Sequence, residues 1–345
     1  MKILNKIINE NKNTYLIAEI GINHNGSISK AVRMIDYAKN AGFDAVKFQT
    51  IVPELLMQKN TPLANYQKKN KSKNMFELIK KYNFLEDDFI NIKKYCNKKK
   101  ITFLSTPFDE QSANFLNKIN IPAFKISSTD NDNFLLLSLI KKYKKPILLS
   151  TGMMDLKELK KTLSFLNLKR DMLAIFHCIS EYPTPISRAQ INSLNQLKKF
   201  KYNIGFSDHT IGSACAISAT TLGATMIEKH ITLDNKMEGP DHSSSLECKD
   251  LKKFVLDIRE IKKMLRVKKR SLTKIELLNK LVAKKALYYK NDIKKNNKIS
   301  SDNLIALRPR LKGISPSYYK TFLNKKISKN VFKNNFVKNS DIDSQ

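Results

Sequence analysis

No run of apolar residues in this 345-residue chain approaches the length that crosses a bilayer. Residues 1–15 are polar and rich in lysine and asparagine, and they lack the apolar core of a secretory signal peptide. These two absences argue against a membrane protein. The sequence therefore predicts a cytoplasmic protein with no membrane partner.

Cysteine is also rare. The chain has four cysteines, Cys96, Cys178, Cys215 and Cys248, which lie far apart and form no CxxC pair. That spacing argues against a zinc ribbon and against a disulfide framework. We expect reduced thiols, most of them buried.

Acidic residues are scarce: the chain has 31 Asp and Glu against 63 Lys and Arg, a formal net charge of +32. An excess of this size invites a nucleic-acid partner. The lysines, however, form scattered clusters, such as 80–81, 98–100 and 141–145, on segments with helical spacing. No RNP-like aromatic motif and no zinc finger accompanies them. We therefore interpret the charge as solvated helix faces and expect no nucleic-acid partner.

Short apolar runs alternate with amphipathic stretches over most of the chain. The runs lie at 15–20, 45–48, 101–104, 123–126, 147–149, 173–176, 202–206 and 225–227. Between them, 29–41 has the helix period and Gly42 just past its end as a stop signal, and 251–265 has the same period. Eight strand–helix units favour an α/β fold of the (β/α)8 TIM-barrel type over an open sheet.

The pattern changes after about Arg270. Residues 271–285 read as a polar connecting segment with some helix character, and short β-like runs separated by turns follow it. We predict a barrel domain over 1–270, a linker over 271–285 and a small β-rich domain over 286–345.

Polar side chains stand where the apolar runs end. Three pairs of them are two residues apart: Lys47 and Gln49, Ser207 and His209, Glu228 and His230. Residues two apart in a strand face the same way, and the carboxyl ends of barrel strands form the active-site face. Other polar residues at or just beyond run ends are Glu19, Thr106, Lys125, Ser150 and Tyr182. The sequence therefore predicts a pocket lined by strand ends.

Two histidines in this set suggest a metal site. His209 and His230 end successive predicted strands, so their imidazoles can converge. Two neutral imidazoles leave coordination positions open for substrate oxygens, which suits Mn²⁺ or a similar divalent ion acting as a Lewis acid. Glu228 shares a face with His230 and is a candidate to orient it or to join the outer shell of the metal.

Lysines and hydroxyls in the set suggest an anionic substrate. A lysine at a buried strand end must be partnered or bind an anion, because burying an unpaired ammonium is costly. Lys47 and Lys125 meet this description, and hydroxyls that could join them are those of Thr106, Ser128, Ser150 and Ser207. The alternative for either lysine is a Schiff base, as in barrel aldolases. Glu19 and Asp241 are candidates to contact a sugar hydroxyl or to move a proton.

The blocks AEIGINHNGS, AVKFQT, STPFDE, FKISS, LLSTGM, HCISEYPTP, GFSDHT, EKHITLD and GPDHSSSLE occur in this order along the chain. Together they resemble N-acetylneuraminate (sialic acid) synthases and their nonulosonate-synthase relatives. The segments LRPRLKGIS and FLNKKISKN resemble the SAF, or antifreeze-like, domain that these enzymes carry. The resemblance spans nearly the whole chain.

This resemblance implies condensation of phosphoenolpyruvate with an open-chain N-acylated amino sugar, with release of phosphate. It implies that His209 and His230 hold Mn²⁺ or Mg²⁺, and that Arg308 of a domain-swapped homodimer contacts the N-acyl group. Glu19, Gln49 and Asp241 would hold the amino sugar. The residues implied for phosphoenolpyruvate are Lys47, Thr106, Lys125, Ser128, Ser150, Ser180, Tyr182 and Ser207.

The acceptor sugar is left with two alternatives. The block GPDHSSSLE resembles the N-acetylneuraminate and legionaminate branches. N-acetylmannosamine is the first choice, and a 2,4-diacetamido-2,4,6-trideoxyhexose is the second. The polar segment 52–73 is expected to cover the pocket and to influence this choice.

Several positions depart from the family pattern. Ser127-Ser128-Thr129-Asp130 replaces the usual Gly-Ser-Gly-Glu, which questions the local geometry there. In the C-terminal part, Asn296 and Asn324 replace residues of glycine-containing turns, and asparagine tolerates positive φ. Arg310 is a competitor for the role of Arg308.

Overall fold

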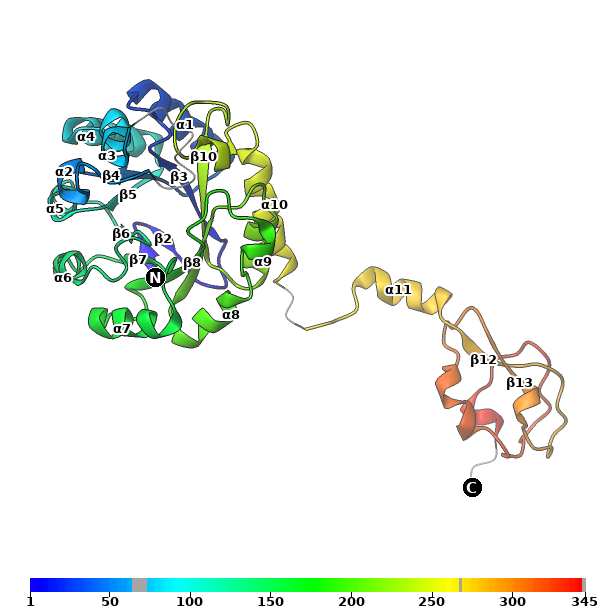
Figure 1. Ribbon diagram of the computed structural model, residues 1–345. Coiled ribbons are helices and arrows are strands. Elements are labelled where there is room, and N and C mark those ends of the chain that lie inside the picture. Colours follow the sequence, from blue (N-terminus) through cyan, green and yellow to red (C-terminus); the bar gives the residue numbers. More distant parts are fainter. Residues whose placement is uncertain (64–72, 267–268, 343–345) are drawn as a thin grey trace. The chain divides into compact units, whose positions relative to one another are not determined.

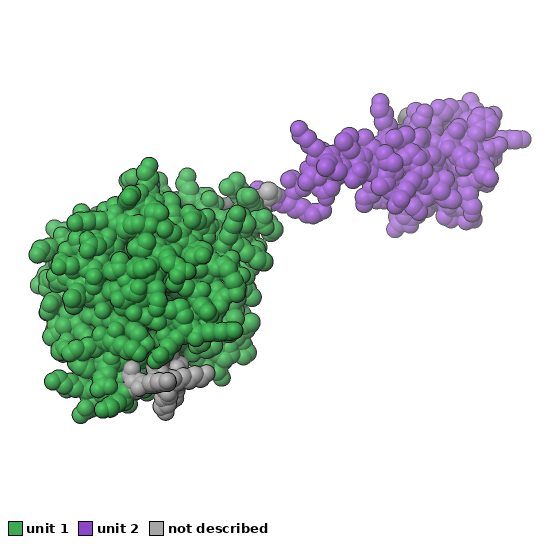
Figure 2. Space-filling model, turned by 90° about the horizontal axis from the view of Figure 1, so that it is seen from above, with its two compact units in different colours: residues 1–266 green, residues 267–345 purple. Residues whose placement is uncertain are grey.

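Two units make up the structure, which is a computed structural model that describes residues 1–63, 73–266 and 269–342. They are Met1–Arg266 and Val267–Gln345, drawn in different colours in Figure 2. Among the described residues, no helix is both long enough and apolar enough to span a membrane.

Parallel strands form the centre of the first unit (Figure 1). Their hydrogen-bonded order is β5-β4-β3-β10-β9-β8-β7-β6, and the two end strands, β5 and β6, are also neighbours. The sheet is therefore a nearly closed barrel, and the predicted TIM-barrel class is confirmed. The barrel strands are β3 (Tyr15–Gly21), β4 (Ala45–Thr50), β5 (Thr102–Pro107), β6 (Phe124–Ile126), β7 (Ile147–Ser150), β8 (Leu173–Cys178), β9 (Asn203–Asp208) and β10 (Met226–Thr232).

Helices lie outside the strands and pack on them through apolar faces (Figure 1). Helix α1 begins after Ser27, whose side chain accepts a hydrogen bond from the Lys30 amide, and it ends at Gly42 with a φ of 96°. Only glycine adopts that φ without strain, so the predicted stop signal is confirmed. The helices of this unit are α1 (Ile28–Ala41), α2 (Pro53–Leu56), α3 (Met75–Tyr82), α4 (Glu86–Lys99), α5 (Glu110–Lys118), α6 (Phe134–Lys142), α7 (Leu156–Leu166), α8 (Ser193–Leu197), α9 (Ala214–Thr221) and α10 (Leu251–Met264).

The barrel interior is closed at the end where the strands begin. Tyr15 and Met226, the first residues of β3 and β10, belong to a buried cluster that also includes Ile3 and Ile8. Ile3 is the last residue of β1 (Lys2–Ile3) and Ile8 directly follows β2 (Lys6–Ile7), the two strands of the N-terminal hairpin. Apolar side chains thus fill this end, and the cavity described below lies towards the carboxyl ends of the strands.

The second unit has its own apolar core, built on the antiparallel pair β12 (Ala286–Tyr289) and β13 (Leu304–Leu307). Helix α11 (Lys274–Ala283) precedes this pair, within the segment predicted as a linker. Asn296 and Asn324 have φ values of 67° and 64°. The prediction that asparagine carries both turns in place of glycine is confirmed.

Candidate active site

The register of the barrel strands places the predicted polar side chains at the same height along the barrel. His230 of β10 is paired with Glu19 of β3, and Glu19 is paired with Lys47 of β4. On the other side of β10, Glu228 is paired with Ser207 of β9. Since alternate strand residues share a face, these side chains point inward together above the apolar barrel interior.

A cavity of about 480 Å³ lies among these strand ends. It is lined by every predicted site residue of the first unit: Glu19, Lys47, Gln49, Thr106, Lys125, Ser128, Ser150, Ser180, Tyr182, Ser207, His209, Glu228, His230 and Asp241. The remaining predicted site residue, Arg308, belongs to the second unit. The sequence thus located the cavity, while the role of each residue stays a prediction.

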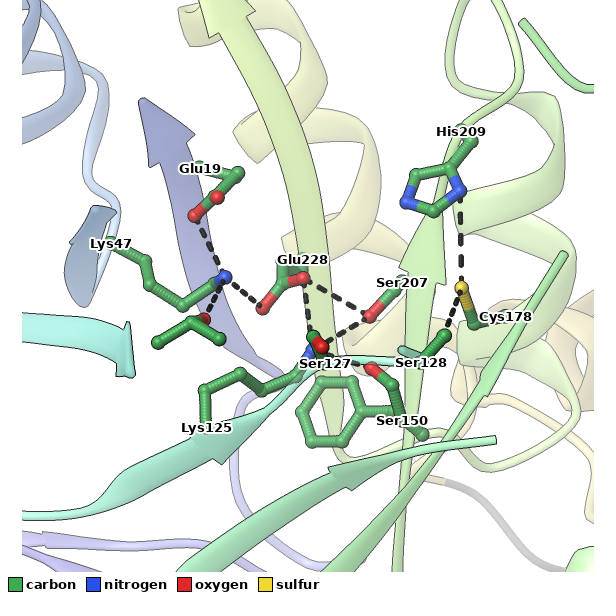
Figure 3. A network of polar contacts seen from close by, with 12 residues as sticks. Glu19, Lys47, Lys125, Ser127, Ser128, Ser150, Cys178, Ser207, His209 and Glu228 are labelled. Atoms are coloured by element: carbon green, nitrogen blue, oxygen red, sulfur yellow. Dashed lines mark hydrogen bonds and ion pairs between the residues drawn. The ribbon is translucent and has the colours of Figure 1, made fainter. Parts of the chain in front are cut away.

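Two buried lysines and two buried glutamates form a connected network in the cavity (Figure 3). The Lys47 Nζ lies 3.0 Å from Glu19 Oε2 and 3.7 Å from Glu228 Oε2, and it donates to Thr106 Oγ1 at 2.9 Å. The Lys125 Nζ lies 3.1 Å from Glu228 Oε1. Glu228 therefore bridges the two ammonium groups, a pairing that the sequence analysis did not foresee.

Lys125 makes two further contacts with hydroxyls. Its Nζ donates to Ser150 Oγ at 2.7 Å and to Ser207 Oγ at 3.3 Å. Ser207 in turn donates to Glu228 Oε1 at 3.1 Å. An ammonium has three protons, and here three oxygen atoms surround it.

The two glutamates have opposite pKa shifts. Burial raises the pKa of Glu19 to about 7, because desolvation outweighs the attraction of Lys47. Burial also disfavours the Glu228 carboxylate, but Lys125 and Lys47 outweigh it and lower the pKa of Glu228 to about 2. At neutral pH, Glu228 is therefore a fixed negative charge, whereas Glu19 can hold or release a proton.

The two predicted metal ligands are close to each other. The ring centroids of His209 and His230 are 5.6 Å apart, and the Tyr182 ring stacks on His209 at 4.0 Å. The Nδ1 of His209 is 2.7 Å from the Ile179 carbonyl oxygen, so Nδ1 carries the proton of the neutral ring. In that tautomer the lone pair is on Nε2, the nitrogen that could bind a metal ion.

His230 also suits a ligand role. Its Nδ1 is buried and, within the described part of the chain, has no hydrogen-bond partner. Burial lowers the pKa of His230 well below its usual value, which favours the neutral imidazole that binds metals. Among the described residues, no three His, Cys, Asp or Glu side chains gather as a metal-binding group. The donor set is thus two imidazoles, with other coordination positions left to small molecules.

Cys178 is a residue of this site that the sequence analysis missed. Its Sγ lies 3.8 Å from His209 Nδ1 and 3.6 Å from Ser128 Oγ (Figure 3). Although burial disfavours a charged imidazole, this sulfur, the Ile179 carbonyl and the Glu228 carboxylate together outweigh burial and raise the pKa of His209. Cys178 is the last residue of β8 and precedes Ser180 by two residues. This spacing was the signal in the sequence that could have placed its side chain in the site.

The altered loop after β6 is held by hydrogen bonds among its own side chains. The hydroxyls of Ser127 and Thr129 donate to Asp130 Oδ2 at 2.8 Å and 2.9 Å. Asn133 Nδ2 donates to the other carboxylate oxygen of Asp130 at 3.1 Å. Ser127, Ser128 and Thr129 line the cavity, so the departure from the family pattern adds hydroxyls to this side.

An apolar wall closes another side of the cavity and was not identified from the sequence. Its members follow β3, β4 and β5 or lie on and next to α2 and α3, and they are Ile22, Ile51, Leu56, Met57, Met75, Ile79 and Phe108. Leu56 and Met57 come from the segment 52–73 that was predicted to cover the pocket. Residues 64–72 of that segment lie outside the described residues.

Asp241 reaches the cavity from the loop after β10. Its Oδ2 lies 4.0 Å from His230 Nδ1, and burial raises the pKa of Asp241 to about 6.

In the second unit, the Arg310 guanidinium donates to the Lys285 carbonyl at 2.9 Å and to Ser315 Oγ at 3.1 Å. Arg308 is exposed. Of the two arginines, Arg310 is thus the one held by neighbouring groups.

Two family models match this chain. The NeuB family model matches residues 34–270, and the SAF domain model matches residues 284–343. Both matches agree with the resemblance found in the sequence motifs.

Individual relatives match over most of their length. An N,N'-diacetyllegionaminic acid synthase of Campylobacter jejuni is 38% identical over 92% of this chain and 97% of its own. A pseudaminic acid synthase of the same species is 33% identical over 96% of this chain and 98% of its own. The crystal structure of a sialic acid synthetase from Leptospira borgpetersenii, solved with citrate, superposes with a TM-score of 0.71. That structure is 32% identical and covers 81% of this chain and 94% of its own.

Proposed function

Because this chain belongs to the NeuB family and carries a SAF domain, we propose that it condenses phosphoenolpyruvate with an N-acylated amino sugar and releases phosphate. The product would be a nine-carbon sugar acid of the sialic acid type. The observation that supports this most strongly is one cavity that combines the bridged lysines Lys47 and Lys125 with the imidazole pair of His209 and His230.

The lysine side of the cavity fits phosphoenolpyruvate. Lys47 and Lys125 supply two ammonium groups, and Thr106, Ser150 and Ser207 supply hydroxyls that already contact them. We assign Ser128 and Ser180 to the same substrate. Gly152 lies against both, because a Cβ there would be 2.5 Å from Ser128 Oγ and 2.4 Å from Ser180 Oγ. The missing side chain leaves room for these two hydroxyls.

The Schiff-base aldolase alternative has one point in its favour: burial lowers the pKa of Lys125. The geometry around Lys125 is less favourable for a Schiff base. A Schiff base would require the Lys125 Nζ to give up its contacts with Ser150, Ser207 and Glu228. An ammonium that remains in place and binds an anion keeps the network intact, so the condensation remains the better-supported function.

The imidazole side fits a divalent metal ion, Mn²⁺ or Mg²⁺. In a neutral His209 ring the lone pair is on Nε2, because Nδ1 donates to the Ile179 carbonyl, and His230 Nδ1 is buried without a hydrogen-bond partner among the described residues. We propose that these two side chains hold the ion. When bound there, it would supply Lewis-acid polarisation of the sugar aldehyde oxygen.

In the proposed reaction, the methylene carbon of phosphoenolpyruvate forms a bond to the aldehyde carbon, and water adds to the resulting cationic carbon. The C–O bond to phosphate then breaks. As the ketone forms, one proton of the added water leaves with the phosphate, and the other proton goes to the former aldehyde oxygen. Glu19, whose pKa burial raises to about 7, is suited to take up and return this proton.

Gln49 Nε2 donates to Glu19 Oε1 at 3.3 Å and is assigned, with Asp241, to the sugar hydroxyls.

The apolar wall bears on the acceptor. N-acetylmannosamine has a hydroxymethyl group at C6, whereas the 2,4-diacetamido-2,4,6-trideoxyhexose has a methyl group there and a second acetamido group. Burying one methyl or methylene group contributes about 0.8 kcal/mol, and burying a hydroxyl without a partner costs roughly 1–3 kcal/mol. The wall therefore supports the trideoxyhexose, as does the name of the Campylobacter relative, ahead of N-acetylmannosamine.

Competition between the two acceptors tests this choice. We expect kcat/KM for the trideoxyhexose to exceed that for N-acetylmannosamine by roughly 10- to 200-fold, the range for small differences of apolar contact. Met57→Gln, which places an amide in the wall, should reduce the ratio, whereas Met264→Gln, at an exposed position of α10 that does not line the cavity, should leave it unchanged. A higher kcat/KM for N-acetylmannosamine in the unaltered protein would reverse the assignment.

We also propose a homodimer. In the second unit, α11 exposes five large apolar side chains: Ile275, Leu277, Leu278, Leu281 and Val282. A second copy of the chain is the partner that would cover them.

Arg308 stays the candidate for the N-acyl group, in preference to Arg310, whose guanidinium is already engaged.

A further inference from the structure

His242 is a fully buried histidine that the proposed chemistry does not use. It lies in the loop that follows β10 and begins the short helix His242–Ser244. Its Nδ1 is 2.7 Å from Thr232 Oγ1, and its Nε2 is 3.1 Å from Asn25 Oδ1. Because Thr232 ends β10 and Asn25 lies in the loop after β3, one imidazole joins two elements next to Asp241, which lines the cavity.

The same two loops are joined by amide side chains. Asn25 Nδ2 donates to the Glu238 carbonyl at 2.8 Å. Asn23 Nδ2 donates to Ser245 Oγ at 2.9 Å, and Ser245 Oγ donates to the Asp241 carbonyl at 2.6 Å. These bonds enclose Asp241, the cavity residue between them, on both sides along the chain.

The imidazole also packs against the turn that precedes Asp241. Gly239 has a φ of 152°, and a Cβ there would be 2.5 Å from His242 Cδ2. Asn25 Oδ1 accepts, since the Asn25 amide nitrogen is used on Glu238, so His242 Nε2 is the donor. Nδ1 of the neutral ring then accepts from the Thr232 hydroxyl at 2.7 Å, which is the shorter of that hydroxyl's two contacts, since the Asp234 carbonyl lies at 3.1 Å. Burial lowers the pKa of His242 to about 4, in keeping with this neutral ring.

We propose that His242 is a positioning residue: its neutral imidazole ties the turn of residues 239–241 to the loop after β3 and thereby fixes Asp241 for the acceptor sugar. The proposal rests on the proposed function for its kinetic consequence. The lysine side of the cavity has its own contacts, so a change at His242 should weaken acceptor binding and leave phosphoenolpyruvate binding in place.

Two conservative variants separate the two imidazole contacts. In His242→Gln, the amide nitrogen can occupy the place of Nε2 and keep the bond to Asn25. In His242→Asn, the amide oxygen can occupy the place of Nδ1 and keep only the bond to Thr232. We expect His242→Asn to raise KM for the acceptor about tenfold, with KM for phosphoenolpyruvate unchanged, and His242→Gln to stay within about threefold of the unaltered protein.

Hydrogen exchange gives a second readout that needs no activity. Amides of residues 235–245 should exchange faster in His242→Asn than in His242→Gln. Thr220→Val, which removes a buried hydroxyl bond within α9, is the control for a general loss of stability and should change neither readout. Equal acceptor KM values and equal exchange in the two His242 variants would overturn the proposal. Absence of phosphate release from the unaltered protein would instead refute the proposed function, while the exchange comparison still decides the role of His242.

Discussion

At the scale of single residues, the site depends on how its buried charges are paired. Glu228 lies between Lys47 and Lys125, and all three side chains are almost completely buried. Removing one member of such a group leaves another charge buried without a partner, which costs about 3–5 kcal/mol. The pairing thus makes stability and function depend on the same three side chains.

Substitutions at Lys125 and Glu228 test this pairing. Lys125→Met should lower the free energy of unfolding by about 3 kcal/mol, because it removes the nearer of the two ammonium groups that pair with the Glu228 carboxylate and leaves Lys47 at 3.7 Å. The double variant Lys125→Met/Glu228→Gln should recover most of the stability but none of the activity. Urea denaturation and phosphate release measure the two effects. If the double variant is less stable than Lys125→Met, Glu228 does not depend on Lys125.

The raised pKa of Glu19 predicts that the activity depends on pH. Its pKa is raised to about 7 by burial, so the ionised form that accepts a proton becomes populated only as the pH rises towards 7. The value of kcat/KM for the acceptor should therefore rise roughly tenfold per pH unit below 7 and level off above it. In Glu19→Gln, activity should be low and this rise should disappear. An unchanged pH profile in Glu19→Gln would show that another group carries the proton.

Sequence patterns identified polar residues of this cavity because alternation is simple to read. Lys47 and Gln49, or Glu228 and His230, need only the period of two to share a face. The pattern could not assign Cys178, because a cysteine that ends an apolar run is also typical of a buried core thiol. Likewise, the bridge from Glu228 to two lysines on other strands depends on distances across the barrel.

At the scale of elements, the loops after the strands give the cavity its two different sides. The loop after β6 contributes Ser127, Ser128 and Thr129, whereas the regions after β3, β4 and β5 contribute the apolar wall. Local spacing predicted the strands and helices well, since each buries one face. The apolar wall could not be predicted, because Ile51 or Ile79 has the same sequence signature as a core residue.

Gly152, in the loop after β7, tests the packing of two of these loops. In Gly152→Ala, the new methyl group would lie 2.4 Å from Ser180 Oγ and 2.5 Å from Ser128 Oγ, so both hydroxyls must move. We expect KM for phosphoenolpyruvate to rise at least about tenfold and the melting temperature to change little. Ser218→Ala, on the outer helix α9, is a control of similar size. Unchanged phosphoenolpyruvate kinetics in Gly152→Ala would remove these hydroxyls from the substrate site.

At the scale of the whole molecule, each unit has a separate apolar core, one within Met1–Arg266 and the other within Val267–Gln345. We propose that 1–270 and 286–345 are separate domains joined by 271–285. Composition predicted the change of character near Arg270, but it could not show that α11 would leave its apolar residues exposed. Exposure depends on which partner is present, which a single chain does not specify.

The proposed homodimer can be tested on α11. Ile275 and Leu278 are 69% and 66% exposed, and they lie three residues apart on one face of the helix. Ile275→Asp/Leu278→Asp should convert a dimer to a monomer in light scattering, with circular dichroism unchanged. The control is Lys280→Asp, which changes a charge on the helix side away from Ile275 and Leu278 and should remain dimeric. A monomeric unaltered protein would contradict the dimer.

The central claim is that the cavity joins phosphoenolpyruvate to an N-acylated amino sugar. The most direct measurement is phosphate release from phosphoenolpyruvate in the presence of Mn²⁺ and the 2,4-diacetamido-2,4,6-trideoxyhexose or N-acetylmannosamine. We predict one phosphate per sugar consumed, no release without sugar, and loss of release in His209→Ala and His230→Ala with the fold intact by circular dichroism. No phosphate release with either sugar, or equal release without sugar, would contradict the account.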